Sequence, residues 1–236
     1  MTSPRTFRLA YVPGVTPAKW VRIWSERRPD VPLELVACAA AEATSMLSDR
    51  RADAAVLRLP VGPGDAGYLH TVTLYAEATV AVVPKDHVIT AADEITAADL
   101  ADEQVVTPRD DTLAWPVGEP VSHRPDSTPD ALELVAAGVG LVVVPQSLAR
   151  MYHRRDLTYR PVKDAPSSTV ALAWPRQTES ELVDEFVGIV RGRTANSSRG
   201  QDGPQPKRTA REKTLAKQAA RAAAGKTPPT RARRRR

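Results

Sequence analysis

Residues 128–152, TPDALELVAAGVGLVVVPQSLARMY, constrain the fold more than any other stretch, because they combine a helix, a strand and a second helix. Thr128, which a proline follows, is typical of a helix N-cap. Apolar residues recur at helical spacing after it, and Gly138 and Gly140 predict the helix end, since glycine adopts positive φ at low cost. The run Leu141–Val144 predicts a strand buried on both faces, as in a parallel sheet covered by helices.

Strands and helices alternate in the first third of the chain. Such alternation predicts βαβ units and therefore an α/β fold. The helix that begins at Pro17 has Thr16 as its expected N-cap. The expected strands are Phe7–Val12, Val31–Val36 and Ala54–Leu59, and the expected second helix is Glu42–Arg50.

The rhythm changes after residue 60. Two neighbouring β-rich segments, Leu69–Tyr75 and Thr79–Val83, predict that the chain crosses to a second subdomain near Val82–His87. A return strand at Thr169–Trp174 then leads to a final helix. This helix is expected at Glu181–Val190, with a capping box between Thr178 and Glu181.

Charge divides the chain into two unlike parts. Residues 193–236 contain 14 Lys and Arg and 2 Asp and Glu, a net of +12, whereas residues 1–192 contain 19 and 26, a net of −7. Ser, Asn, Gly, Gln and Pro dominate up to residue 206, and residues 210–224 have helix propensity without an apolar stripe. We therefore expect an acidic folded body, residues 1–192, and a disordered basic tail, residues 193–236.

Several function classes find no support in the residues. The single cysteine, Cys38, excludes an internal disulfide and fits a reducing compartment. No apolar run reaches the roughly 18 residues that a membrane helix needs, and no signal peptide is evident, so we expect a cytoplasmic protein. Histidines lack metal-ligand spacing, and nucleophile-elbow and nucleotide-binding glycine motifs are missing. We expect no metal, no cofactor, no catalytic residues and no enzymatic activity.

Five segments in this order resemble the effector-binding domain of LysR-type transcriptional regulators. The segments are FRLAYVPGVTP, RRPDVPLELV, SDRRADAAVLRLP, VAVVPKDH and AAGVGLVVVPQSLA. The resemblance implies the type 2 periplasmic-binding-protein fold, with two α/β lobes that close on a small molecule. It places lobe I at about residues 7–83 and 167–192 and lobe II at about 84–166. It also implies a homodimer, in which the first helix of one subunit, Pro17–Arg28, packs on Thr128–Val139 of the other.

Two features depart from the family pattern. The family carries an N-terminal winged helix-turn-helix, whereas this chain begins directly at the effector domain, so DNA reading is expected from the tail, a partner or a lost segment. The family also often places Ser or Thr after the second strand to hold an effector. Ala39, Ala40 and Ala41 stand there, which argues against a typical carboxylate effector.

The resemblance suggests a cleft lined by Thr16, Arg58, Thr107 and Thr128. Thr16 and Thr128 could present hydroxyls and helix N-terminal N–H groups to an anion, or could simply cap their helices. Arg58 and Arg109, at strand ends, could bind a carboxylate bidentately or form ordinary ion pairs. Both alternatives stay open for each residue, and no effector can be named.

The tail suggests contact with DNA or RNA. Its cations neutralise phosphates without a fold, and it has no aromatic residue for stacking on bases, so binding is expected to be independent of sequence. The alternatives are a solvated tail, or a nucleoid- or RNA-associated protein whose body is a dimerising scaffold. The expected phosphate-binding residues are Lys207, Arg208, Arg211, Lys213, Lys217, Arg221, Arg233, Arg234, Arg235 and Arg236.

Overall fold

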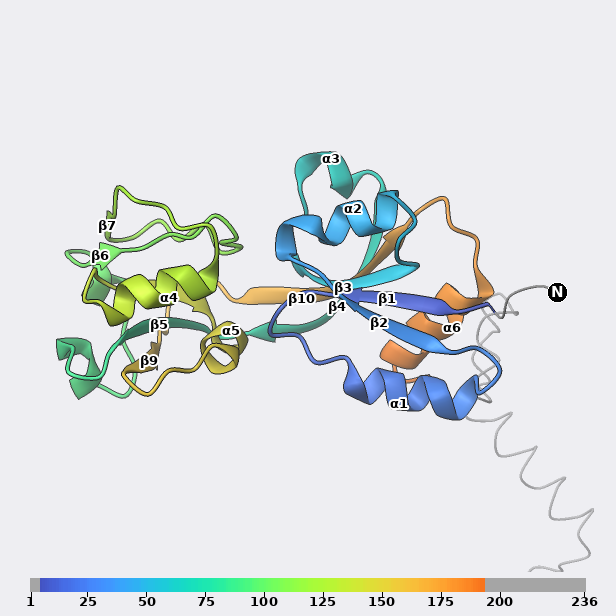
Figure 1. The fold of residues 1–236 in the computed structure, drawn as a ribbon, viewed down its shortest axis with the longest axis horizontal. Coiled ribbons are helices and arrows are strands. Elements are labelled where there is room, and N and C mark those ends of the chain that lie inside the picture. The colour runs from blue at the N-terminus through green and yellow to red at the C-terminus, as the bar shows by residue number, and fades with distance from the viewer. Residues whose placement is uncertain (1–4, 194–236) are drawn as a thin grey trace, which may run out of the picture. The chain divides into compact units, whose positions relative to one another are not determined.

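The computed structural model describes residues 5–193 of the chain. The predicted disorder of the tail and its phosphate-binding residues lie outside this range. Within it, two sheets form the centres of two α/β lobes (Figure 1). No helix in this range is long and apolar enough to cross a membrane.

The first lobe is built on a five-stranded sheet of order β2-β1-β3-β10-β4. The pairs β1–β2 and β1–β3 are parallel, whereas β10 runs antiparallel between β3 and β4. Helices α1 and α6 cover one face of this sheet and α2 the other (Figure 1). The strands are β1 (Phe7–Tyr11), β2 (Leu33–Ala37), β3 (Ala54–Leu59), β4 (Leu69–Glu77) and β10 (Ser168–Pro175). The helices are α1 (Ala18–Arg27), η1 (Ala40–Glu42), α2 (Ala43–Ser48), α3 (Pro63–Ala66) and α6 (Glu181–Val190).

Three fully buried aromatic rings join α1 and α6 to this sheet. Phe7 on β1 stacks on Trp24 with ring centroids 4.7 Å apart, and Phe186 lies 5.2 Å from Phe7 and 5.9 Å from Trp24. The indole Nε1 of Trp24 donates to the carbonyl oxygen of Val31 at 2.8 Å, so the buried polar atom is satisfied. The apolar faces expected for both helices therefore meet in one core.

The second lobe has a smaller sheet of order β8-β5-β9, in which both pairs are antiparallel. A long irregular segment, residues 106–118, joins the two strands of a short additional sheet, β6-β7, and residues 121–127 lead on to α4. The strands are β5 (Thr79–Pro84), β6 (Gln104–Val105), β7 (Glu119–Pro120), β8 (Val142–Pro145) and β9 (Leu157–Pro161). The helices are η2 (Val88–Ala91), η3 (Ala97–Leu100), α4 (Thr128–Ala136) and α5 (Gln146–Met151).

Two predictions about strands need correction. Strand β8 is buried as expected but pairs antiparallel with β5, and an isolated parallel bridge joins Val105 to Leu141, the residue before this strand. Strand β5 belongs to the second sheet, so the chain crosses between the lobes at Ala78 rather than at Val82–His87. In both cases the partner strand is distant in sequence, and local periodicity does not specify it.

Three predicted helix caps also differ. Pro17 occupies the N-cap of α1, so Thr16 lies one residue outside it. Ser127, not Thr128, caps α4. Ser180 is the N-cap of α6 and makes no side-chain cap hydrogen bond, so the predicted Thr178–Glu181 capping box is absent from this helix. The glycines that end α4 do have the predicted positive φ, 84° at Gly138 and 108° at Gly140.

Candidate functional site

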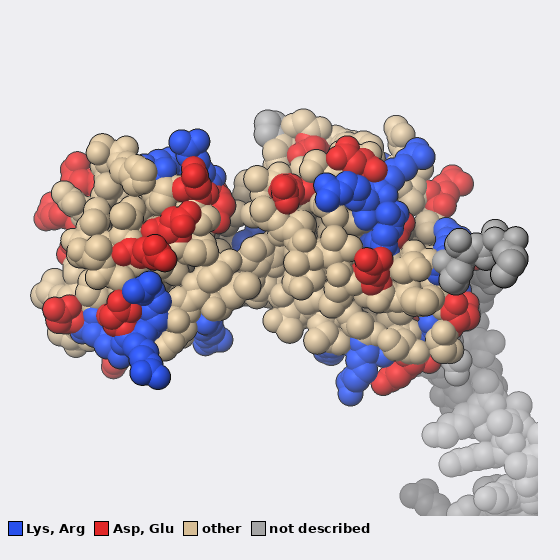
Figure 2. All heavy atoms as spheres, viewed as in Figure 1, with Lys and Arg blue, Asp and Glu red and all other residues tan. Residues whose placement is uncertain are grey.

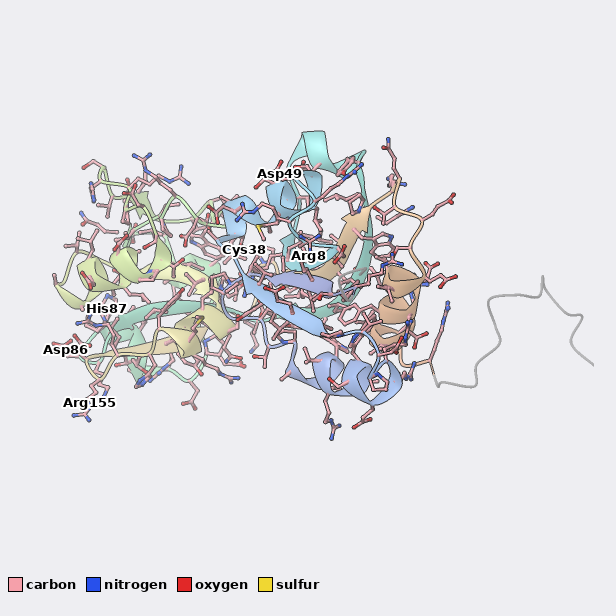
Figure 3. The ribbon with its side chains drawn as sticks, turned by 45° about the vertical axis from the view of Figure 1, so that its right-hand side comes forward. Arg8, Cys38, Asp49, Asp86, His87 and Arg155 are labelled. Atoms are coloured by element: carbon pink, nitrogen blue, oxygen red, sulfur yellow. The ribbon has the colours of Figure 1, made fainter. Side chains whose placement is uncertain are left out.

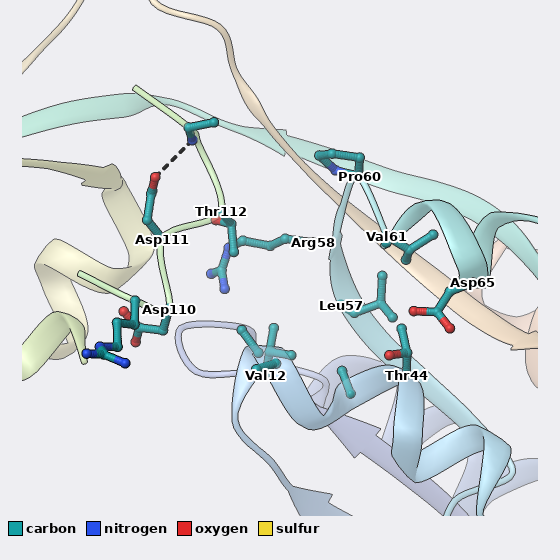
Figure 4. Close-up of a pocket in the computed structure, with 16 residues that line it drawn as sticks. Val12, Thr44, Leu57, Arg58, Pro60, Val61, Asp65, Asp110, Asp111 and Thr112 are labelled. Carbon is teal, nitrogen blue, oxygen red and sulfur yellow. Dashed lines mark hydrogen bonds between the residues drawn. The ribbon is translucent and has the colours of Figure 1, made fainter. Parts of the chain in front are cut away.

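A cavity of about 450 Å³ lies between the lobes, which is a typical size for a small-molecule site. One wall comes from the start of α2 and the loop after β3, and the other from the irregular segment 109–114 (Figure 4). The lining residues are Val12, Ala40, Ala41, Ala43, Thr44, Leu57, Arg58, Pro60, Val61, Gly62 and Asp65 of the first lobe, and Arg109, Asp110, Asp111, Thr112 and Ala114 of the second.

A recess of about 190 Å³ adjoins this cavity and extends it toward the N-terminus of α4. The cavity and the recess share Ala40, Arg58, Asp110 and Thr112. Tyr152 lines the recess, where burial chiefly raises the pKa of its hydroxyl. The charge of Asp110 raises the same pKa further, while Arg58 lowers it by a smaller amount.

Arg58 is buried, and its guanidinium forms hydrogen bonds to other groups of the chain. The side chain is 1% exposed. Nε donates to Oε2 of Glu77 at 2.9 Å, Nη1 to the carbonyl oxygen of Pro13 at 2.9 Å, and Nη2 to Oγ of Ser147 at 2.9 Å. Because Ser147 belongs to α5 while the other partners belong to the first lobe, Arg58 links the two lobes.

The polar groups of Thr128 also form hydrogen bonds within the chain. It is 2% exposed, and both its N–H group and its hydroxyl donate to the carboxylate of Asp110 at 3.0 Å. The positive end of α4 therefore already carries an anionic group of the chain. A ligand would meet Asp110 before it reached Thr128.

The other predicted site residues lie apart from one another. Arg109 lines the cavity, but its side chain is 69% exposed and its Nε pairs with Oδ1 of Asp126 at 3.1 Å. Thr16 is exposed and lines a different hollow, together with Ser147 and Met151. Thr107 is half-buried and lines neither the cavity nor the recess. The structure thus brings Arg58 and Arg109 to one cavity and leaves the predicted threonines out of it.

Two carboxylates that line the cavity, Asp65 and Asp111, were not predicted to bind a ligand. Asp65 of α3 points toward Thr44 on the first-lobe wall (Figure 4). Asp111 of the second lobe accepts hydrogen bonds from the N–H groups of Leu113 and Ala114, both at 2.9 Å. Asp65 could have been noticed, since it is the single charged residue of the glycine- and proline-rich loop PVGPGDAG.

Cys38 lies at the end of β2, within the first lobe (Figure 3). Its thiol is half-buried and contacts the carbonyl oxygen of Tyr11 at 3.7 Å. Burial raises the pKa of this thiol, and the charge of Glu42 raises it further. The thiolate that redox and metal chemistry require is therefore disfavoured. No group of His, Cys, Asp and Glu within residues 5–193 is arranged to hold a metal ion.

A family model for the LysR substrate binding domain matches residues 4–195. No curated protein matches the chain. Among solved structures, the chain is similar to the BenM effector-binding domain with its effector benzoate, at 19% sequence identity and a TM-score of 0.65, over 86% of this chain and 97% of that one.

Two further similarities are to OxyR. The oxidised form matches at 21% identity and a TM-score of 0.64, over 79% of this chain and 92% of that one. A regulatory-domain mutant from Pseudomonas aeruginosa matches at 19% identity and a TM-score of 0.60, over 80% and 100% of the two chains. At these identities the similarities establish the fold.

Proposed function

The chain belongs to the LysR substrate-binding domain family, and from this premise we propose that a small-molecule effector binds in its inter-lobe cavity and controls transcription. One observation carries this proposal: residues of both lobes line the same cavity. A molecule that contacts both walls stabilises the closed arrangement over the open one, and so shifts the population toward it. We propose binding alone, without chemistry on the ligand.

Redox sensing is an alternative function, because the chain is similar in fold to the oxidised and reduced forms of OxyR. The cysteine content of the chain favours effector binding over this alternative. The chain has a single cysteine, so it cannot form an internal disulfide. The raised pKa of the Cys38 thiol also lowers its reactivity at neutral pH.

A thermal-shift screen of small metabolites on the full chain tests the proposal. A ligand that binds only the folded state at one hundred times its Kd stabilises that state by about 2.7 kcal/mol. Replacing Ala40 by Trp should block the cavity and abolish the shift, whereas replacing exposed Leu35 by Trp serves as the control. If no metabolite raises the Tm, or if Ala40→Trp leaves the shift intact, the proposed site is wrong.

We further propose a homodimer through α1 and α4. On α1, Trp24 is fully buried, whereas Trp20 and Ile23 are only half-buried, and Leu134 on α4 is half-buried too. These apolar side chains would be covered at an interface between two copies. Sedimentation of the full chain should show a dimer, and Trp20→Glu should shift it to monomer. A wild-type chain that stays monomeric at high concentration contradicts this.

A second proposed function concerns nucleic acid and rests on charge. Residues 193–236 carry a net of +12, whereas residues 1–192 carry −7. On the face of the described body shown in Figure 2, basic side chains lie beside acidic ones on both lobes. We therefore assign phosphate contact to the tail rather than to the body.

Duplex DNA should bind weakly, without sequence preference. If about six phosphates are neutralised, log K should fall with log salt at a slope near −5. Deleting residues 207–236 should abolish binding in a mobility-shift assay. Binding that survives the deletion, or that does not depend on salt, would move the nucleic-acid site into the body.

A further inference from the structure

The two arginines of the inter-lobe cavity offer little positive charge to a ligand. Arg58 is 1% exposed and already pairs with Glu77, whose side chain is 8% exposed. Arg109 is reachable from solvent but pairs with Asp126. One guanidinium is inaccessible, and the other is compensated by a neighbouring carboxylate.

Three carboxylates line the same cavity. Asp65 belongs to the first lobe, and Asp110 and Asp111 to the second. Among the ion pairs formed between residues 5 and 193, none includes any of these three. After the paired arginines are set aside, the walls carry an excess of negative charge on both lobes.

Carboxylates of the chain also occupy the helix starts that border the cavity. At η1, Oε2 of Glu42 accepts from the N–H group of Ala39 at 3.4 Å. At α4, Asp110 accepts from the N–H group of Thr128 at 3.0 Å. An anionic ligand would have to displace one of these groups and would be repelled by the other.

Two further observations concern the walls of the cavity and the recess. Thr112 lines both, and its buried Oγ1 has no hydrogen-bond partner in the part of the chain that the structure describes. A buried polar group without a partner is destabilising, so this wall is held at a cost in stability. In the recess, burial chiefly raises the pKa of the Tyr152 hydroxyl, and the charge of Asp110 raises it further.

We propose that the effector is a small organic cation, whose amine or guanidinium group is held by carboxylates of both lobes. This inference rests on the proposed function and names the ligand class of the same cavity. Like charges on the two walls repel each other as the lobes close, while no cation lies between them. A bound cation removes this repulsion and forms charge-assisted hydrogen bonds to both walls, so it favours closure.

Calorimetric titration of the full chain with a matched pair of probes tests the ligand class. The pair is 1,4-diaminobutane and succinate, a dication and a dianion of similar length. We expect the diamine to bind and succinate to give no heat of binding. Asp65→Asn should weaken diamine binding about tenfold, because it removes one charged partner at nearly constant shape.

Controls separate charge from misfolding. Asp65→Glu keeps the charge and should restore most of the affinity. Asp86→Asn, at the outer end of the second lobe and away from the cavity (Figure 3), should leave the affinity unchanged. The Tm of each variant without ligand should match that of the wild type, because the Asp65 side chain forms no hydrogen bond within residues 5–193.

Three outcomes overturn the inference. Binding of succinate without the diamine would contradict the ligand class but keep effector binding in this cavity. Diamine binding that Asp65→Asn and Asp111→Asn leave unchanged would place the amine elsewhere. If both probes, a wider amine panel and the metabolite screen all fail, the ligand class and the proposed function fail together.

Discussion

The first lobe encloses one continuous apolar core, whereas the second lobe has a separate apolar cluster on each face of its sheet. In β5, Val80 and Val82 belong to one cluster, and Ala81 and Val83 belong to the other, as the alternation of side chains in a strand requires. Three buried aromatic rings reinforce the first core. The second lobe instead supplies the irregular segment that forms the polar wall of the cavity.

This difference suggests a division of roles. The first lobe has the larger sheet and provides a stable base. In the second lobe, two side chains of the irregular segment, Thr112 and Trp115, hold buried polar atoms without a partner in the described range. Unsatisfied polar groups lower stability. We therefore expect this segment to be less stable than the first lobe and to contact the ligand.

The largest expected effect is from Trp24→Ala in the first lobe. This substitution removes a fully buried ring, its stacking on Phe7 and its hydrogen bond to Val31, and should lower the free energy of unfolding by about 4 kcal/mol. Urea denaturation measures the loss. Trp174→Ala is the matched control and should cost clearly less, since Trp174 is half-buried. Equal losses would show that the aromatic cluster is not the base of the first lobe.

The next effect concerns the link between the lobes. Arg58→Met leaves Glu77 buried without its cation, and should lower the free energy of unfolding by roughly 3 kcal/mol. Arg109→Gln breaks an exposed pair and should change it by less than about 1 kcal/mol. If urea denaturation shows the two substitutions to be equivalent, Arg58 is not a structural residue.

A smaller loss of stability is expected from removing a helix cap, and it should differ between the two lobes. Ser127→Ala in the second lobe removes the side chain that caps α4 and should cost about 1 kcal/mol. Ser180→Ala at the start of α6 should be close to neutral, because Ser180 makes no side-chain cap hydrogen bond. Thermal unfolding of both variants checks this, and a larger loss at Ser180 would reverse the assignment.

The smallest effect is a dependence on pH. At η3, the N–H group and the hydroxyl of Thr96 donate to Asp99 at 2.7 and 2.8 Å and lower the pKa of its carboxyl. A carboxyl with a lowered pKa in the folded state stabilises the protein above its ordinary pKa. That contribution disappears as the pH falls through the lowered value.

Asp99→Asn should therefore reduce the difference in Tm between pH 6 and pH 3 by a small amount. Thermal unfolding at both pH values measures this difference, and an unchanged difference for Asp99→Asn contradicts the expectation.

The sequence predicted those elements whose boundaries depend on local patterns. Strand β3 and helix α6 begin and end at the predicted residues, because an apolar run that only Arg58 interrupts defines the strand and a clear amphipathic period defines the helix. The predicted parallel pairing of β8 was wrong, because its antiparallel partner β5 lies about sixty residues earlier and local sequence does not specify it. The cap of α4 was misplaced by one residue, because Ser127 and Thr128 are chemically equivalent at this position.

The cavity was harder to predict than the fold. Arg58 was identified as a residue of the cleft, but its commitment to Glu77 and Ser147 depends on contacts across 19 and 89 positions. The excess of carboxylates at Asp65 and Asp111 arises only when α3 of the first lobe and the irregular segment of the second lobe line one cavity. Composition gives the net charge of the body but not where that charge gathers.

The position of β10 has a consequence for how the protein is made. This strand lies between β3 and β4, yet every residue of the second lobe is synthesised before it. On the ribosome, β3 and β4 therefore wait with unpaired edges until residue 175 has emerged, and unpaired edges promote aggregation. Since chains lengthen at about 5–20 residues per second, this exposure lasts several seconds. A mutation that slows folding of the second lobe would therefore reduce the yield of the first, even where it touches none of its contacts.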